Sequence, residues 1–207
     1  LLDTKIKKGM LSHKKSLNIL KKTNALLDGH FVLSSGLHSP KYIQCAKLLS
    51  YPHLAKDICF SLSEKIKKKF KKIDLILSPA IGGIIIGYEI GRLLKKETIF
   101  CERLNGKFNI RRGFKIKKES KVLIIEDVIT TGKSSLECVK LIKKSRAMIV
   151  GFACIIDRSN KKTLKIKQKI ISHLRIVVPT FSKNKLPTFL KSIPITKPGS
   201  RHIKWND

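Results

Sequence analysis

The hydrophobic residues of this chain fall into two alternating patterns. Short aliphatic runs, which are typical of buried strands, precede longer segments in which hydrophobic residues recur at helical spacing. The helix that opens at Pro52 is the clearest, because hydrophobic side chains recur there at every fourth position. The patterns predict helices at residues 18–27, 52–70, 84–95 and 133–145, and strands at residues 73–78, 98–101, 121–125 and 147–156.

Two further segments follow neither pattern. Residues 29–45 contain short alternating runs on either side of Ser-Ser-Gly and Ser-Pro, which predict a pair of strands joined by loops. Residues 102–120 are polar, and Asn105-Gly106 is a turn signal, so we expect either a hairpin or a mobile loop there.

Strands that alternate with helices favour parallel β-α-β units and an open α/β sheet. Such sheets bind ligands at the carboxyl ends of their strands. Two turns of this chain lie at such ends, one after Ser78 and the other after Ile125. We therefore expect ligand-binding residues in both turns.

Composition limits the class of protein. With 207 residues, of which 42% are hydrophobic, the chain can form one domain with a substantial core. Its apolar runs are much shorter than the roughly 20 residues of a membrane span, and its first residues lack the pattern of a signal peptide. The five cysteines lie singly in apolar segments, so we expect buried, reduced thiols and a cytoplasmic location.

The net charge of +31 is compatible with nucleic acid, an acidic membrane surface or an anionic small substrate. The lysines are spread over every segment rather than gathered in one stripe, and they accompany heavy isoleucine use, as an AT-rich genome would produce. We therefore expect neither a membrane nor nucleic acid as the main partner, whereas an anionic small substrate fits the charge.

The stretch VLIIEDVITTGKS at residues 122–134 carries the most chemical information. Its Gly-Lys-Ser ending suggests a P-loop, but Asp127 stands where that motif requires a glycine. The segment from Thr130 to Ser134 instead offers backbone N–H groups, hydroxyls and the positive end of a helix to one phosphate monoester. Upstream, Glu126 and Asp127 can accept hydrogen bonds from sugar hydroxyls, so the stretch spans one ribose 5-phosphate.

This stretch resembles the phosphoribosyl-pyrophosphate signature of the type I phosphoribosyltransferases, in which hydrophobic residues precede two acids and a loop rich in threonine and glycine. Three segments narrow the resemblance to the orotate phosphoribosyltransferase family: a hood segment GHFVLSSGLHSPKYIQC, a pyrophosphate loop SPAIGG and a strand end IIDRSN. The closing IPITKPGSR is similar to the tail of one bacterial subgroup, so the resemblance covers residues 20–201.

The resemblance implies the α/β fold of the type I phosphoribosyltransferases, with a mostly parallel central sheet flanked by helices and a small N-terminal hood. Within one structural domain it implies three parts, with a helix and hood at residues 1–50, an α/β core at residues 51–180 and a segment completing the hood at residues 181–207.

It also implies a reaction. Members of this family transfer the ribose-5-phosphate group of phosphoribosyl pyrophosphate to orotate, giving orotidine 5′-monophosphate and pyrophosphate in pyrimidine biosynthesis. Mg²⁺ is carried by the pyrophosphate donor, so no metal-ligating residue is assigned, and a homodimer shares its active sites.

The resemblance assigns site residues as well. The catalytic residues would be Asp127, Glu126, Arg103 and Lys107. Phosphoribosyl pyrophosphate would contact these four and Ala80, Ile81, Gly82, Gly83, Arg112, Val128, Ile129, Thr130, Thr131, Gly132, Lys133 and Ser134. Orotate would contact Ser35, Gly36, Tyr42, Ile43, Thr130 and Arg158. The Ala80–Ile81 peptide bond is expected to be cis, and many family members carry a lysine where this chain has Gly82.

Other interpretations of the same residues remain open. A purine phosphoribosyltransferase would share the ribose-phosphate loop, although a neutral purine has no use for Arg158. A regulator could have kept the sugar-phosphate pocket and bind RNA through its positive surface. The basic residues of the segment 102–120 could also form a solvated loop, and the two acids could simply be solubilising charges.

Overall fold

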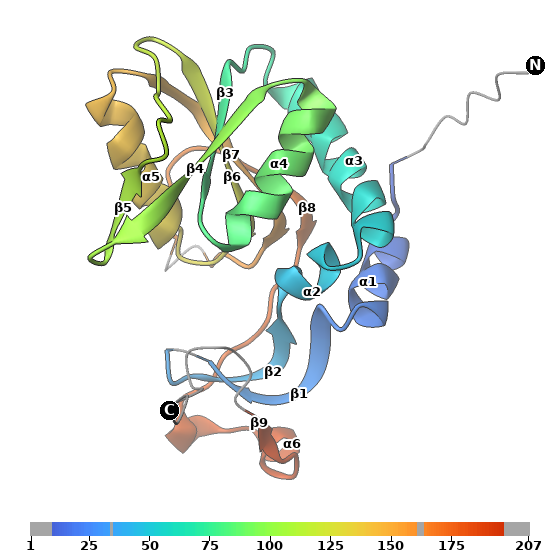
Figure 1. Cartoon of the computed structure of the whole chain (residues 1–207). Coiled ribbons are helices and arrows are strands. Elements are labelled where there is room, and N and C mark those ends of the chain that lie inside the picture. The colour runs from blue at the N-terminus through green and yellow to red at the C-terminus, as the bar shows by residue number, and fades with distance from the viewer. Residues whose placement is uncertain (1–9, 34, 161–163, 197–207) are drawn as a thin grey trace, which may run out of the picture.

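The computed structural model describes residues 10–33, 35–160 and 164–196. Its main sheet has six strands in the order β5-β4-β3-β6-β7-β8, which are parallel except that β5 runs antiparallel to β4 (Figure 1). The predicted α/β fold with a mostly parallel sheet is therefore confirmed. The strands are β3 (Leu75–Pro79), β4 (Glu97–Leu104), β5 (Lys107–Ile110), β6 (Lys121–Ile129), β7 (Met148–Asp157) and β8 (Ile170–Arg175).

Helices cover both faces of the main sheet (Figure 1). One face carries α3 and α4, with α1 and the short α2 beside them, and the other face carries α5. Two buried clusters result, and residues of β6 alternate between them: Leu123 and Ile125 pack on the α3–α4 side, whereas Val122 and Ile124 pack on the α5 side. The helices are α1 (His13–Lys22), α2 (Cys45–Leu49), α3 (Pro52–Lys69), α4 (Gly82–Leu94) and α5 (Lys133–Lys144).

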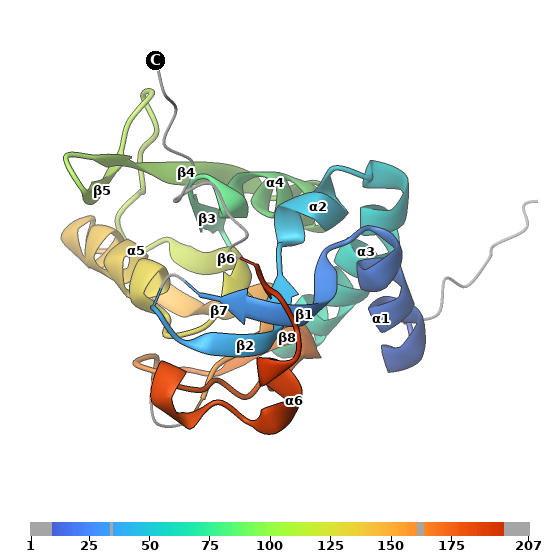
Figure 2. The same cartoon turned by 90° about the horizontal axis from the view of Figure 1, so that it is seen from below.

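A smaller sheet of three strands lies across the carboxyl ends of the main strands (Figures 1 and 2). We call this sheet, with α6 (Thr188–Lys191), the hood. Its strands follow the order β2-β1-β9, with β1 antiparallel to β2 and parallel to β9. They are β1 (Leu26–Val32), β2 (His38–Ile43) and β9 (Ile195–Thr196).

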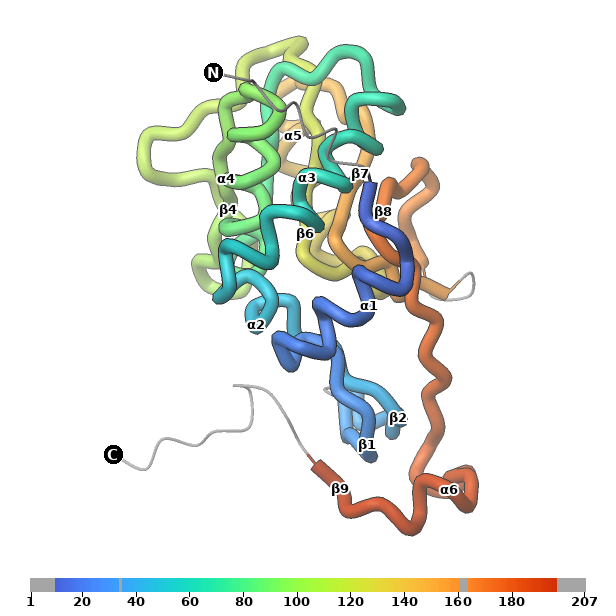
Figure 3. Tube along the Cα trace, turned by 90° about the vertical axis from the view of Figure 1, so that its right-hand side faces the viewer, coloured from blue at the N-terminus to red at the C-terminus, as the bar shows by residue number. Residues whose placement is uncertain are grey.

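The C-terminal part of the chain returns to the N-terminal hairpin to build this hood. After β8 the chain runs past the short 3₁₀ helix η1 (Lys183–Lys185) and α6 to reach β9 beside β1 (Figure 3). Two buried histidines join these parts, because His30 Nε2 lies 2.6 Å from His38 Nδ1 and His30 Nδ1 lies 3.2 Å from the Ile193 carbonyl oxygen.

Most predicted elements are found within a few residues of their expected bounds, but two predictions were wrong. The first helix begins at His13 and ends at Lys22 rather than at residue 27, because Asn24 adopts a left-handed φ of 54° and turns the chain into β1. The strand expected to end at Ile125 continues to Ile129, so both acids lie inside β6. The segment 102–120 does contain a hairpin, between β4 and β5.

The remaining expectations concern cysteines and membranes. All five cysteines are free and buried, as predicted. Among the described residues, none of the helices combines the length and hydrophobicity that a membrane span requires. Residues 197–207, which include the end of the family-like tail, lie outside the described part of the chain.

Helix α4 lies close to the sheet because glycines face it at every fourth position. Gly83, Gly87 and Gly91 are buried, and a Cβ atom at Gly87 would lie 2.2 Å from the Ser78 hydroxyl oxygen. At Gly91 a Cβ atom would lie 1.9 Å from the Thr98 hydroxyl oxygen. This close contact fixes the start of α4, and with it the turn after β3, against the end of the sheet.

We expect Gly87→Ala to lower the free energy of unfolding by about 1–2 kcal/mol, because overpacking exceeds the gain in helix propensity. Urea denaturation measures this change. Ser78→Ala alone should cost little, since its buried hydroxyl has no hydrogen-bond partner among the described residues. The double variant should regain part of the lost stability. A Gly87→Ala protein as stable as the parent would show that the close contact between α4 and β3 is unimportant.

Candidate active site

The two turns expected to bind ligand meet at the carboxyl ends of β3 and β6. Gly82, the first residue of α4, faces the Asp127 side chain so closely that a Cβ atom there would lie 2.8 Å from the carboxylate. The missing side chain therefore lets the Asp127 carboxylate approach the turn. The preceding Ala80–Ile81 peptide bond is cis, as the family resemblance implied.

Residues 130–134 lead from β6 into α5 and form an open turn. Gly132 is the N-cap residue with a φ of 74°, a conformation that suits glycine. No side chain in the described part of the chain caps this helix end, so its first N–H groups and its partial positive charge can serve an anion. Thr130, Thr131 and Lys133 are exposed around it.

Residues 165 and 166, later in the chain, pack against the same turn. Lys165 donates its backbone N–H to the Thr131 carbonyl oxygen at 3.2 Å. The side chain of Ile166, which is 6% exposed, lies so near Gly132 that a Cβ atom there would come within 2.7 Å. The turn is thus held by packing, and glycine is required at its centre for both conformation and space.

Glu126 is buried on the α5 side of β6. Its carboxylate accepts a hydrogen bond from the Ser135 hydroxyl, in the first turn of α5, and only 7% of the residue is exposed. Burial raises the pKa of Glu126 to about 7; the Ser135 hydrogen bonds lower it, and the neighbouring Asp127 charge raises it further. Glu126 therefore links β6 to the first turn of α5.

Asp127 points to the opposite face, toward α4 and α2. Its Oδ1 accepts a hydrogen bond from the Val128 N–H at 2.8 Å. Burial raises the pKa of Asp127 above its ordinary value, and the backbone N–H groups oppose that shift. The Cys45 thiol, at the start of α2, lies 3.8 Å from the Asp127 carbonyl oxygen. The side chains of the two neighbouring acids therefore lie on opposite faces of β6, one next to the start of α5 and the other next to the start of α4.

Arg158 directly follows β7, and its side chain interacts electrostatically with Tyr42 of the hood. Its N–H donates to the Ile129 carbonyl oxygen at 2.8 Å, which fixes the backbone beside the end of β6. Burial lowers the pKa of the Arg158 guanidinium, while Tyr42 and Cys45 act on it electrostatically in the opposite sense. No carboxylate among the described residues forms an ion pair with Arg158, so its charge is available to an anionic ligand.

The hood residues occupy three different environments. Ser35 and Gly36 are exposed in the turn between β1 and β2, where Gly36 has a φ of 78°. Tyr42 is half-buried and packs against Phe31 with ring centroids 5.7 Å apart. Ile43 is 7% exposed and belongs to the main core, so its side chain supports the hood from behind.

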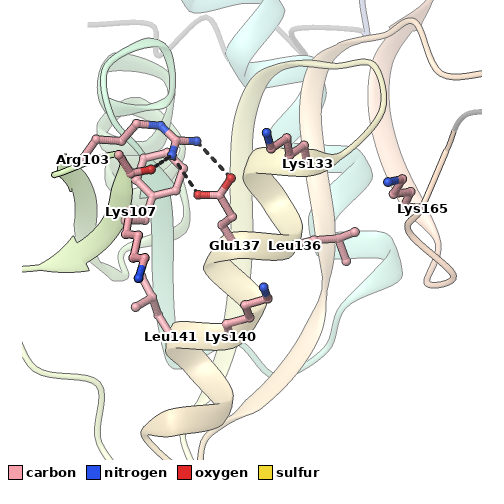
Figure 4. Close-up of a pocket in the computed structure, with 10 residues that line it drawn as sticks. Arg103, Lys107, Lys133, Leu136, Glu137, Lys140, Leu141 and Lys165 are labelled. Carbon is pink, nitrogen blue, oxygen red and sulfur yellow. Dashed lines mark hydrogen bonds and ion pairs between the residues drawn. The ribbon is translucent and has the colours of Figure 1, made fainter.

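The basic residues expected to act together lie on two sides of β4. The Arg103 guanidinium forms two hydrogen bonds to the Glu137 carboxylate, at 2.9 and 3.1 Å, and lies 4.0 Å from the Phe108 ring centroid. Figure 4 shows this pair in a groove of about 590 Å³ between the β4–β5 hairpin and α5, which Lys107 also lines. Arg112 instead pairs with Glu102 at 3.2 Å.

Several residues of this region were missed from the sequence. The Ser135 hydroxyl donates a hydrogen bond to Glu126, and the Glu137 carboxylate accepts hydrogen bonds from Arg103. Glu102 forms an ion pair with Arg112. The signal for Ser135 was present, because it lies in the first turn of the expected helix, 9 residues after Glu126. The partners of the two arginines could not be paired without knowing how the hairpin lies on α5.

We expect the buried Glu126 to make the fold less stable as pH rises. Its pKa in the folded protein, about 7, lies above the ordinary 4.5. Below pH 4.5 the carboxyl is neutral in both the folded and the unfolded protein. Between pH 4.5 and about pH 7 the folded protein binds more protons than the unfolded chain, so the free energy of unfolding falls as pH rises. Above the higher value the full cost, on the order of 3 kcal/mol, is present.

Glu126→Gln keeps an acceptor for Ser135 and removes this ionisation. Urea denaturation of parent and variant should therefore show a stability difference that shifts in favour of the variant by about 2–3 kcal/mol between pH 5 and pH 8. A difference that is the same at both pH values would contradict the burial of an ionising carboxyl.

Comparison with known proteins agrees with this geometry. A family model described as Phosphoribosyl transferase domain matches residues 45–184. A curated orotate phosphoribosyltransferase of Parvibaculum lavamentivorans is 46% identical over 194 residues, which is 93% of this chain and 100% of that protein. One of Caldicellulosiruptor bescii is 45% identical over 185 residues, covering 89% of this chain and 96% of the relative.

Solved structures share the fold. A crystal structure of orotate phosphoribosyltransferase from Aeropyrum pernix superposes with a TM-score of 0.66 at 22% identity, covering 77% of this chain and 92% of the other. The family model and the curated relatives go further than this likeness of fold, because they match most of the chain in sequence. The chain therefore belongs to the phosphoribosyltransferase family, within its orotate phosphoribosyltransferase group.

Proposed function

We propose that this protein transfers the ribose-5-phosphate group of phosphoribosyl pyrophosphate to orotate, releasing pyrophosphate and giving orotidine 5′-monophosphate. The strand order carries the proposal, because Arg158 follows β7, the two acids lie near the end of β6 and the pyrophosphate turn follows β3, and these three strands are adjacent. Adjacent strands lie about 4.8 Å apart, so base, ribose and pyrophosphate can lie over them in turn. The names of the curated relatives support the same substrates.

The bond between the anomeric carbon and pyrophosphate breaks, and a bond to a ring nitrogen of orotate forms as that nitrogen loses its proton. The sugar passes through an oxocarbenium-like state, as in other glycosidic cleavages. Asp127 would face this positive sugar and accept hydrogen bonds from its hydroxyls. No nucleophile from the protein is needed, so catalysis comes from positioning and charge stabilisation.

The 5-phosphate would lie on the turn at residues 130–134, where backbone N–H groups and hydroxyls converge. Glu126 would help to position the turn that holds this phosphate, because its carboxylate accepts a hydrogen bond from Ser135 in the first turn of α5. Thr130 is exposed at the end of β6 and could contact both ribose phosphate and orotate.

Orotate would lie between the end of β7 and the hood. Its planar carboxylate matches the fork of the Arg158 guanidinium, which can donate two parallel hydrogen bonds. Tyr42 would present a flat face to the base, and Ser35 and Gly36 would close the hairpin turn over it. The uncompensated positive charge of Arg158 favours orotate over a neutral purine.

Pyrophosphate would lie on the turn formed by Ala80, Ile81, Gly82 and Gly83, at the start of α4. Mg²⁺ carried by the pyrophosphate would neutralise charge on this leaving group. The donors fit such an ion, since Mg²⁺ is usually held by one or two carboxylates together with phosphate oxygens, and the Asp127 carboxylate faces the turn at Gly82.

We also propose that two copies of the chain share their active sites. Helix α4 exposes an apolar stripe next to the pyrophosphate turn, formed by Ile81, Ile85 and Tyr88, which are 85%, 54% and 67% exposed. Their spacing places them on one side of the helix, where a second copy could cover them. Following the family resemblance, the Arg103 and Lys107 side chains would act on the partner's substrate.

The function is tested by supplying phosphoribosyl pyrophosphate and Mg²⁺ with orotate, adenine, hypoxanthine or uracil in separate reactions. We expect nucleotide formation with orotate alone, detected by chromatography. Asp127→Asn should reduce turnover at least a hundredfold while leaving the unfolding transition in place, because it removes the charge beside the sugar. Product from a purine but not from orotate would overturn the proposal.

Shared sites predict complementation between two inactive variants. After Arg103→Ala and Asp127→Asn subunits are mixed and re-equilibrated, activity should rise to about a quarter of the parent value, because mixed dimers keep one intact site. Ile85→Asp in both subunits should produce monomers by sedimentation and abolish this rescue. Independent monomers that remain fully active would refute the shared arrangement.

A further inference from the structure

The segments that precede β3, β6 and β7 lie together at the end of the main sheet opposite the hood (Figure 1). The Asp74 N–H donates to the Lys121 carbonyl oxygen at 2.8 Å, which joins the first segment to the second. The Glu119 N–H donates to the Arg146 carbonyl oxygen at 3.0 Å, which joins the second to the third. We call these three neighbouring segments the basic end: residues 67–74, 117–121 and 143–148.

The basic end is much richer in positive charge than the chain as a whole. Of its 19 residues, eleven are Lys or Arg and two are acids, whereas the whole chain has 45 Lys and Arg among 207 residues. The basic residues are Lys67, Lys68, Lys69, Lys71, Lys72, Lys117, Lys118, Lys121, Lys143, Lys144 and Arg146. The fold therefore gathers at one end lysines that are far apart in the sequence.

Few of these charges have a carboxylate partner. Among the described residues, the ion pairs that reach the basic end are Lys67 with Glu64 at 2.7 Å and Lys118 with Glu119 at 3.2 Å. The other acid, Asp74, accepts a hydrogen bond from the Lys121 N–H at 2.9 Å. All the basic residues here except Lys121 are exposed, so their charged groups are accessible to a partner.

Helix ends account for only part of this charge. Residues 67–69 and 143–144 lie in the last turns of α3 and α5, where a cation stabilises the helix dipole. That effect falls off within the last turn, so it does not explain Lys71, Lys72 or Lys117. Like charges crowded on one surface repel each other, and a bound polyanion would relieve this repulsion.

The kind of polyanion follows from the other side chains at this end. Binding to a membrane surface combines basic residues with apolar ones that enter the headgroup region. The structure describes all three segments, and within them Met148, which is 47% exposed, is the only large hydrophobic residue that is exposed. A nucleic acid needs phosphate contacts alone, and a lysine ammonium on its flexible stem can supply them without a fixed geometry.

We propose that the basic end binds the phosphate backbone of a nucleic acid without preference for base sequence. Base recognition requires arginine forks, amides or stacked aromatic rings, whereas the exposed charges here are lysines together with Arg146 alone. The inference goes beyond the proposed function and does not depend on it. The candidate active site lies at the carboxyl ends of the strands, so a nucleic acid at the opposite end leaves it open.

The test measures binding of a fluorescent oligoadenylate RNA of about 20 nucleotides by anisotropy at several salt concentrations. One variant removes four exposed lysines of the basic end, by Lys69→Gln, Lys72→Gln, Lys117→Gln and Lys144→Gln. The matched control removes four exposed lysines of α1 and α3 outside the basic end, by Lys14→Gln, Lys15→Gln, Lys22→Gln and Lys56→Gln. Both variants lose the same charge, and urea denaturation checks that both fold.

We expect the basic-end variant to bind the RNA about a hundredfold more weakly than the parent at about 0.1 M salt. The slope of log affinity against log salt should become shallower by about 2 to 3, since each lost phosphate contact contributes about 0.7. The control variant should bind within about threefold of the parent, because its lysines make no phosphate contact. Oligocytidylate should bind as oligoadenylate does, and phosphoribosyl pyrophosphate should displace neither.

Equal weakening in both variants would overturn the inference, because binding would then follow net charge rather than this surface. Displacement of the RNA by phosphoribosyl pyrophosphate would also overturn it, since the RNA would then occupy the candidate active site. Vesicles of phosphatidylserine provide the membrane comparison. If the parent binds them through the same four lysines but binds no RNA, the basic end recognises a membrane surface and the inference fails.

Discussion

Alternation of side chains along β6 is the constraint on which the site depends. Residues before the acids divide between two buried clusters, and the same alternation continues through Glu126 and Asp127. It sends Glu126 to Ser135 at the start of α5 and Asp127 to Gly82 at the start of α4. One strand thereby connects two helix N-termini, and the proposed substrate, which carries a phosphate group at each end, would lie between them.

The hood completes this arrangement because it is built from both ends of the chain. Hairpin β1–β2 comes before the core in sequence, and β9 comes after it, yet they form one sheet across the carboxyl ends of the main strands. The buried pair His30 and His38 connects this sheet to the segment before β9. In the proposed function the base would therefore be enclosed by parts of the chain that local sequence patterns could not bring together.

What could be predicted from sequence follows the same division between local and distant interactions. The turn between β6 and α5, the helix from Pro52 and the parallel sheet rest on local spacing, and these elements were predicted correctly, whereas the binding of a phosphate at the turn stays a prediction. The end of the first helix was misplaced because Leu26 and Leu27 suit either a helix or a strand, and only pairing with β2 decides. The partner of Arg103 lies 34 residues away, so nothing near it in sequence could identify Glu137.

The distribution of charge shows why net charge says little about the site. The chain carries a formal charge of +31, yet its central strand carries two acids near its end, one of them buried at a cost of stability. A buried acid of this kind persists where function requires it, because the rest of the fold stabilises the chain enough to tolerate it. A positive side chain has a defined position only where neighbouring groups hold it, as Glu137 holds Arg103 and Glu102 holds Arg112 on the two faces of β4. In the proposed function, ligand recognition would therefore depend on the few acids that position neighbouring groups more than on the many lysines.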